Sequence, residues 1–113
     1  MENKEEKFLK FDGRDGDNPK LMYDLLDVFA IEDLVKVLTH GAQKYSPNNW
    51  HRCKGRIRYY AAAMRHIEAW KKGEDIDPES GLPHLSHAMC CLMFIHGISR
   101  LHPDHDDRKI KDE

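Results

Sequence analysis

Apolar residues recur every three or four positions in two stretches of this chain, and a third stretch is apolar almost throughout. The two periodic stretches, residues 30–45 and 56–72, predict amphipathic helices. The third, residues 82–101, is apolar on nearly every side, which predicts a helix buried in the core or in an oligomer interface. The pattern therefore predicts an all-α fold, a compact bundle of about three main helices joined by ordered loops.

The residues between these stretches are typical of helix ends. Pro47 disfavours helix at the residue before it, and Gly73 is a natural C-terminal residue for the second helix. Ser80 is a candidate cap for the third helix, and Pro83 occupies an early position where a missing N–H costs little. Residues 23–29 fit either an extended segment or a turn of helix.

Two segments lie outside the helical pattern and are poor in apolar residues, namely residues 1–20 and the charged run 102–113. We predict that both are flexible, which leaves one helical domain over residues 21–101. A domain of this length has a limited core, and small helical units are often completed by a second copy. We therefore expect a homo-oligomer.

The composition argues against two classes of partner. The net charge is −2, without the basic excess of a general nucleic-acid binder. No apolar run approaches the length of a membrane span. The three cysteines form no CxxC pair, which fits a reducing cytoplasm, and Cys90 and Cys91 lie in the apolar third stretch, where we expect them to pack in the core.

The charge is unevenly distributed. Residues 44–72 hold eight basic residues and one acid, and four acids follow within residues 74–79. These could be two solvated faces of opposite sign. They could also form a site for a phosphate-bearing ligand, with acids nearby for a cation or a ribose.

Arg58 and Arg65 are candidate phosphate contacts. They are two helical turns apart, about 10 Å, on one side of the predicted second helix. Guanidinium groups match phosphate oxygens, so two on one stripe can clamp a diphosphate. The alternative is that both arginines form salt bridges, either to the acids of residues 74–79, called the acidic loop below, or to a partner subunit.

Aromatic residues interleave with the basic ones. Their rings suit stacking on a nucleobase, and we expect Trp50, next to Asn49, or Tyr45 to supply that contact. We expect Trp70 to lie in the core.

His84 and His87 share a face at the start of the third helix. With the free N–H groups of a helix start they could seat a phosphate. They could instead bind a metal together with Asp77 or Glu79, although two histidines alone do not define such a site. A hydrogen-bonded pair in the core is the third interpretation. His66 could approach them from the second helix.

Two segments, VLTHGAQKYSPNNW and RYYAAAMRHIEAWKKGEDIDPESGLPHLSHAMCCLMF, carry the motifs GAxKYxPxNW, RHxxAW and GEDxDPESGLPHLxHA. Over residues 20–98 the chain resembles the phage dATP/dGTP diphosphohydrolase N-terminal domain. The resemblance implies a phage or prophage origin, a bacterial host cytoplasm, a helical fold and purine nucleotides as ligands. In longer proteins this domain precedes a second one that looks like the carrier of hydrolysis.

More distantly, the chain resembles MazG-like all-α nucleoside triphosphate pyrophosphatases, which hold magnesium with ExxE and ExxD pairs. Here His84 and His87 stand in place of the second pair, and Arg65, His66 and Glu68 in place of the first. Imidazole is a poor magnesium ligand, so the exchange favours an anion over a cation.

Three functions remain open. The first is non-catalytic binding of a purine nucleotide or a nucleotide-derived signalling molecule, which could sequester or sense it and counter host defence. The phosphates would contact Lys44, Arg58, Arg65, His84 and His87. Tyr45 or Trp50 would stack on the base, and Asp77 or Glu79 would accept hydrogen bonds from the ribose hydroxyls. The second is a dATP/dGTP diphosphohydrolase that releases pyrophosphate and requires Mg²⁺ or Mn²⁺. The third is a protein–protein interaction module.

Overall fold

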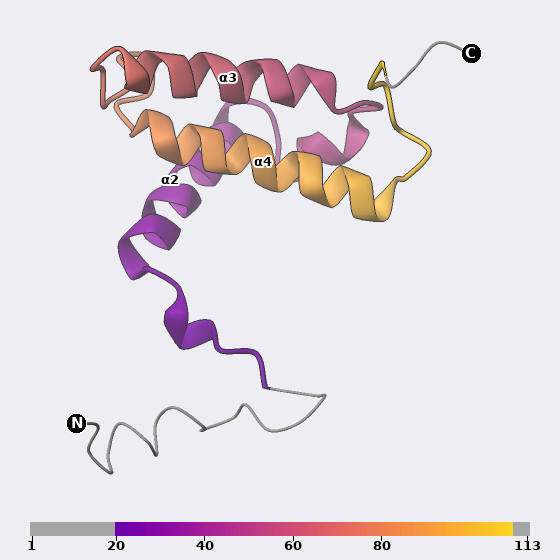
Figure 1. Cartoon of the computed structure of the whole chain (residues 1–113), viewed down its shortest axis with the longest axis horizontal. Coiled ribbons are helices and arrows are strands. Elements are labelled where there is room, and N and C mark those ends of the chain that lie inside the picture. Colours follow the sequence, from indigo (N-terminus) through magenta and orange to yellow (C-terminus); the bar gives the residue numbers. More distant parts are fainter. Residues whose placement is uncertain (1–19, 110–113) are drawn as a thin grey trace, which may run out of the picture.

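The computed structural model describes residues 20–109 of the chain. They form three α-helices, α2 (Val28–Lys44), α3 (Ile57–Lys71) and α4 (His84–Leu101), and two short 3-10 helices, η1 (Tyr23–Leu25) and η2 (Asn49–Arg52) (Figure 1). No strand occurs within this range beyond one isolated bridge in the loop between α3 and α4. The predicted all-α bundle of three main helices is therefore confirmed.

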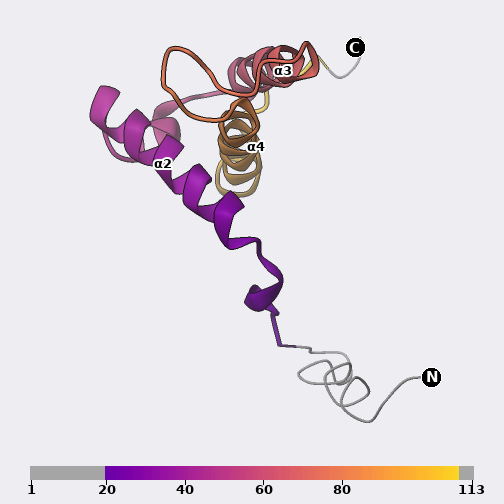
Figure 2. The ribbon, with the colours of Figure 1, turned by 90° about the vertical axis from the view of Figure 1, so that its left-hand side faces the viewer.

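The helices α3 and α4 lie side by side and antiparallel, and α2 crosses α4 (Figures 1 and 2). The core consists of small and medium-sized side chains from all three helices: Val37, Ala63, Ala88, Cys90, Cys91 and Ile98. Cys90 and Cys91 are in the core as predicted, and burial raises the pKa of the Cys90 thiol to about 12. These thiols are therefore inert packing groups.

Apolar side chains remain exposed on all three helices, and α2 and α4 give the clearest examples. The beginning of α2 projects away from α3 and α4 (Figure 2), and Val28 and Phe29 are 65% and 74% exposed. On α4, which we predict to be buried on every side, Leu92 is 53% exposed. Such surface favours the expected homo-oligomer, which stays a prediction.

The side chain of Asp27 caps α2, accepting a hydrogen bond from the Phe29 N–H at 3.1 Å. The predicted cap of α4 is wrong. Pro83 is the residue that precedes the helix, and no side chain caps it. Ser80 instead accepts the Leu82 N–H and contacts His87, so its hydroxyl belongs to the cluster described below.

The C-terminal tail, residues 102–109 of the described range, caps α3 although about fifty residues of sequence separate the two. One carboxylate oxygen of Asp107 accepts the N–H groups of Arg56 and Ile57 at 2.6 and 3.2 Å. Arg56 is buried and pairs with Asp106 at 3.3 Å, and a side chain at Gly55 would overlap the Asp107 carboxylate. The flexibility expected of residues 102–113 stays a prediction, but their first part contacts α3. Of the N-terminal segment 1–20, all but residue 20 lies outside the described residues.

Within residues 20–109, no helix is long and apolar enough to cross a membrane.

Candidate functional site

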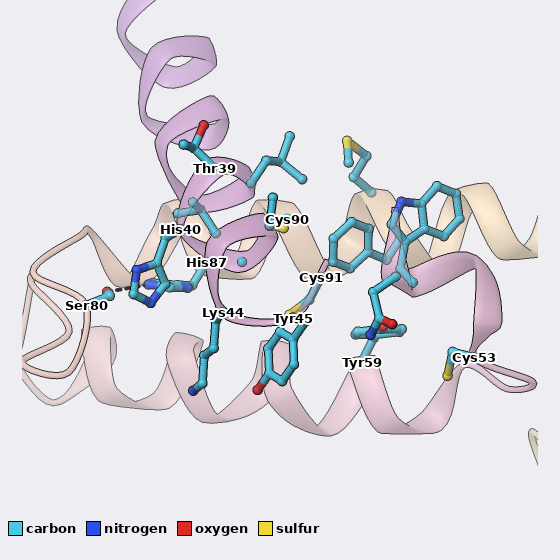
Figure 3. Close-up of a pocket in the computed structure, with 18 of the residues that line it drawn as sticks. Thr39, His40, Lys44, Tyr45, Cys53, Tyr59, Ser80, His87, Cys90 and Cys91 are labelled. Carbon is cyan, nitrogen blue, oxygen red and sulfur yellow. Dashed lines mark hydrogen bonds between the residues drawn. The ribbon is translucent and has the colours of Figure 1, made fainter. Parts of the chain in front are cut away.

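A cleft of about 1100 Å³ lies between the second half of α2, η2 and the α3–α4 pair. Figure 3 shows part of its lining, with His40, His87 and Ser80 together in one region and Tyr45 and Tyr59 in another. The structure brings all the residues that we predict as ligand contacts to this cleft: Lys44, Tyr45, Asn49, Trp50, Arg58, Arg65, His66, Asp77, Glu79, His84 and His87. Their role in binding stays a prediction.

A hydrogen-bonded chain links α3, the acidic loop and α4. His84 is 4% exposed, and its Nε2 lies 2.6 Å from a Glu74 carboxylate oxygen. Its Nδ1 lies 2.9 Å from Nδ1 of His66, on the facing helix. His84 is therefore a buried link between a carboxylate and a second imidazole.

His87 forms a second group with the acidic loop. Its Nε2 lies 2.7 Å from the Ser80 hydroxyl and 3.5 Å from an Asp77 carboxylate oxygen. Asp77 also accepts the Glu79 N–H at 3.1 Å and the Ser80 hydroxyl at 3.3 Å. The His66 ring stacks on the His87 ring with centroids 4.5 Å apart, which joins the two groups.

These contacts set the charge of the cluster. Burial lowers the pKa of His66 and of His87, and repulsion from the other imidazoles adds to this against the attraction of Asp77. Burial alone would raise the pKa of Asp77, but the Glu79 N–H and His87 outweigh it, so that pKa lies below its ordinary value. Near neutral pH the two rings are therefore neutral beside a charged carboxylate.

The structure selects among the metal ligand sets that the sequence leaves open. One donor atom each from His66, Asp77 and His87 lie within 4.8 Å of one another. His84 turns toward Glu74, and Glu79 pairs with Lys44 at 3.2 Å, so neither belongs to this donor group.

Four Lys and Arg residues line the cleft, two of them on α3 and the others Lys44 on α2 and Arg52 on η2. Arg58 and Arg65 both line the cleft and are exposed, as expected for one stripe of a helix. Neither forms an ion pair with any acid in residues 20–109, so the alternative salt bridge to the acidic loop is not seen there, and pairing with a partner subunit stays a prediction. Within the described part of the chain, both arginines that line the cleft are therefore without an acidic partner.

The aromatic residues differ in how closely they are packed and how much of each ring is exposed. The Trp50 ring stacks on Phe94 with centroids 5.3 Å apart, and a Cβ at Gly97 would lie 2.6 Å from it, so Trp50 packs closely on α4. Tyr45 is 67% exposed at the cleft and is the freer ring for stacking. Trp70, expected in the core, is 45% exposed, and that expectation is wrong.

Sequence reasoning gave no role to two residues at the histidine end. Glu74 was one of four acids without distinction, although it is the partner of His84. His40 lines the cleft and adds to burial and to His66 in lowering the pKa of His87. His40 lies four residues before Lys44 on α2, so the two share one helix face. This spacing from a predicted ligand contact is the sequence signal that identifies His40.

A family model described as dATP/dGTP diphosphohydrolase, N-terminal, matches residues 10–108, nearly the whole chain. The chain belongs to this family. A curated relative from Salmonella phage PMBT28, named dATP/dGTP diphosphohydrolase, is 38% identical over 93 residues. The aligned segment covers 82% of this chain, and the chain spans about a third of the relative's length (32%). The comparison with solved structures gives no match.

Proposed function

We propose that the cleft binds a purine nucleoside triphosphate. The observation that carries the proposal is the pair Arg58 and Arg65, which form no ion pair within residues 20–109 and line a cleft that also holds Lys44 and an exposed tyrosine. Ligand clefts are commonly about 300–1,000 Å³, so a cavity of about 1100 Å³ has room for a nucleotide. The printed name of the phage relative, dATP/dGTP diphosphohydrolase, favours a purine nucleotide as the ligand.

In this arrangement the triphosphate contacts α3 and the base stacks on Tyr45. Arg58 and Arg65 provide forked donors to phosphate oxygens. Lys44 is shared between the phosphates and Glu79, because its ammonium group already lies 3.2 Å from that carboxylate. Binding without turnover would let the protein sequester or sense a nucleotide.

Calorimetry with dGTP, dATP and dCTP tests the proposal, with EDTA in one series and a divalent ion in another. A hydrogen bond to a charged group contributes about 1.5–3 kcal/mol, so Arg65→Ala should weaken dGTP binding at least about tenfold. Lys71→Ala is the matched control, because it removes a positive charge from α3 outside the cleft. Equal losses in both variants, or no binding of any nucleotide, would overturn the proposal.

Hydrolysis is the second candidate, favoured by the relative's name and by the donors of His66, Asp77 and His87. In this reaction a water attacks the α-phosphorus, the bond to the β-phosphate oxygen breaks, and a nucleoside monophosphate and pyrophosphate form. Chromatography of dGTP incubated with protein and Mg²⁺, Mn²⁺ or Zn²⁺ measures it. Product that disappears in Asp77→Asn supports hydrolysis, whereas binding without product leaves the protein a binder.

A further inference from the structure

We propose that His66, Asp77 and His87 form a binding site for a borderline divalent transition ion such as Zn²⁺ or Co²⁺. The three residues come from α3, the acidic loop and α4, and one donor atom of each lies within 4.8 Å of the others. Two ligand atoms about 2.1 Å from one ion lie at most about 4.2 Å apart. Small side-chain rotations therefore suffice to close the donors around an ion.

The chain from Glu74 through His84 prepares His66 as a ligand. In a neutral imidazole one nitrogen donates and the other accepts. When Nε2–H of His84 donates to the Glu74 carboxylate at 2.6 Å, its Nδ1 must accept, and Nδ1–H of His66 donates to it at 2.9 Å. The Nε2 of His66 then carries a free lone pair. His84 is then the second-layer partner that orients this ligand, and Glu74 in turn fixes the tautomer of His84.

Asp77 is oriented by its own loop. The Glu79 N–H and the Ser80 hydroxyl hold its two oxygens, one each. The Nε2 of His87 lies 3.5 Å from the oxygen that Ser80 contacts. An ion bound by His87 would replace the contact between this imidazole and Ser80, and Ser80 would keep its hydrogen bond to Asp77.

The donor set indicates which ion is preferred. Two imidazoles and one carboxylate suit zinc and its neighbours, whereas magnesium demands oxygen ligands. The residues present therefore do not fit the carboxylate-held magnesium of MazG-like enzymes. Three protein ligands leave at least one coordination position open, as in catalytic rather than structural zinc sites. Arg65 lines the same cleft, so a phosphate oxygen could fill that position.

Titration of the purified protein with Co²⁺ alone tests the site, without any nucleotide. Imidazole-bound Co²⁺ absorbs visible light, and we expect one ion per chain with such a spectrum. His87→Gln and Asp77→Asn should each weaken Co²⁺ binding more than about 100-fold, beyond the loss typical of a second-layer partner. Using both variants guards against a fold defect in one, and circular dichroism checks each.

The positioning role of Glu74 has a separate readout. Glu74→Gln should weaken Co²⁺ about tenfold while the spectrum of the bound ion keeps its shape, because all three ligands remain. His96→Gln, at an exposed position of α4 outside the cluster, is the matched control and should bind as the unchanged protein does. The double variant at His102 and His105, to Gln, should also bind normally, although these rings stack 4.9 Å apart at the other end of α4.

Three results would overturn the site. They are absence of Co²⁺ and Zn²⁺ binding, full binding in His87→Gln and Asp77→Asn, and displacement of Co²⁺ by a modest excess of Mg²⁺. Because the metal is titrated alone, failure of this site and failure of nucleotide binding are separate outcomes.

Discussion

The two ends of the α3–α4 pair each carry a polar network, and the networks differ in how they are completed. At the tail end, Arg56 pairs with Asp106, and Asp107 accepts two backbone N–H groups of α3. At the other end, the histidine cluster lines the cleft, and one donor atom each of His66, Asp77 and His87 lie within 4.8 Å of one another. A network that closes on the backbone contributes to stability, whereas one with spare lone pairs at a cleft is suited to a ligand.

The comparison predicts that substitutions at the tail end lower stability and leave binding intact. Arg56→Ala should have the largest effect, a loss of about 2–3 kcal/mol in the free energy of unfolding, because it truncates a buried side chain and removes its contact with the partly exposed Asp106. Urea denaturation measures this loss. Arg100→Ala, an exposed arginine on α4, is the control and should stay close to the unchanged protein. Unchanged stability, or loss of dGTP affinity in the folded variant, would break the comparison.

Gly97→Ala should have the next largest effect. Its Cβ would lie 2.6 Å from the Trp50 ring, so the ring or η2 must shift, at a cost of about 1–3 kcal/mol. Gly41→Ala is the opposite case, because a Cβ there meets nothing within 4 Å. Alanine is the better helix former by about 1 kcal/mol, so Gly41→Ala should stabilise the protein. Thermal unfolding of both variants measures the contrast. A change of Tm in the same direction in both variants would contradict it.

Asp107→Asn should lower Tm by a few degrees, at most about 5 °C, because the carboxylate charge favours the positive N-terminal end of α3 and a neutral amide lacks that charge. Its hydrogen bonds to Arg56 and Ile57 hold the pKa of the Asp107 carboxyl below its ordinary value. The folded protein therefore binds this proton less readily than the unfolded chain. The stability that ionised Asp107 contributes is present above about pH 4, the pKa of the unfolded chain. It is lost as the pH falls through the lower pKa of the folded protein. Unfolding from pH 3 to pH 7 should show a shallower acid loss in Asp107→Asn, and parallel curves would count against the cap.

Glu79→Gln should have the smallest effect on stability and should raise nucleotide affinity. The Lys44–Glu79 pair is exposed, and such pairs contribute little. Its removal frees Lys44 and takes a negative charge from the cleft, so dGTP should bind about threefold more tightly at low salt. Calorimetry at low and high salt measures this. Weaker binding would instead make Glu79 a ligand contact, as on a ribose.

Much of the fold follows from local pattern. The spacing of apolar residues predicts α2, α3 and α4 because that periodicity is a property of each helix alone. The site residues were found for the same reason, since Arg58 and Arg65 share a helix face whatever surrounds them. The pairing of Glu74 with His84 and the capping by Asp107 depend on how distant segments meet, which no local spacing encodes. The exposure of Trp70 is likewise set by packing that a single helix pattern does not contain.

The close packing of Trp50 has an optical consequence. The chain holds two tryptophans, and Trp70 can be replaced by phenylalanine at a half-exposed position. Trp50 would then be the sole indole emitter, on the wall of the cleft and against Phe94. Its emission would report directly on what enters the cleft, so fluorescence could time the arrival of a nucleotide or an ion without any label.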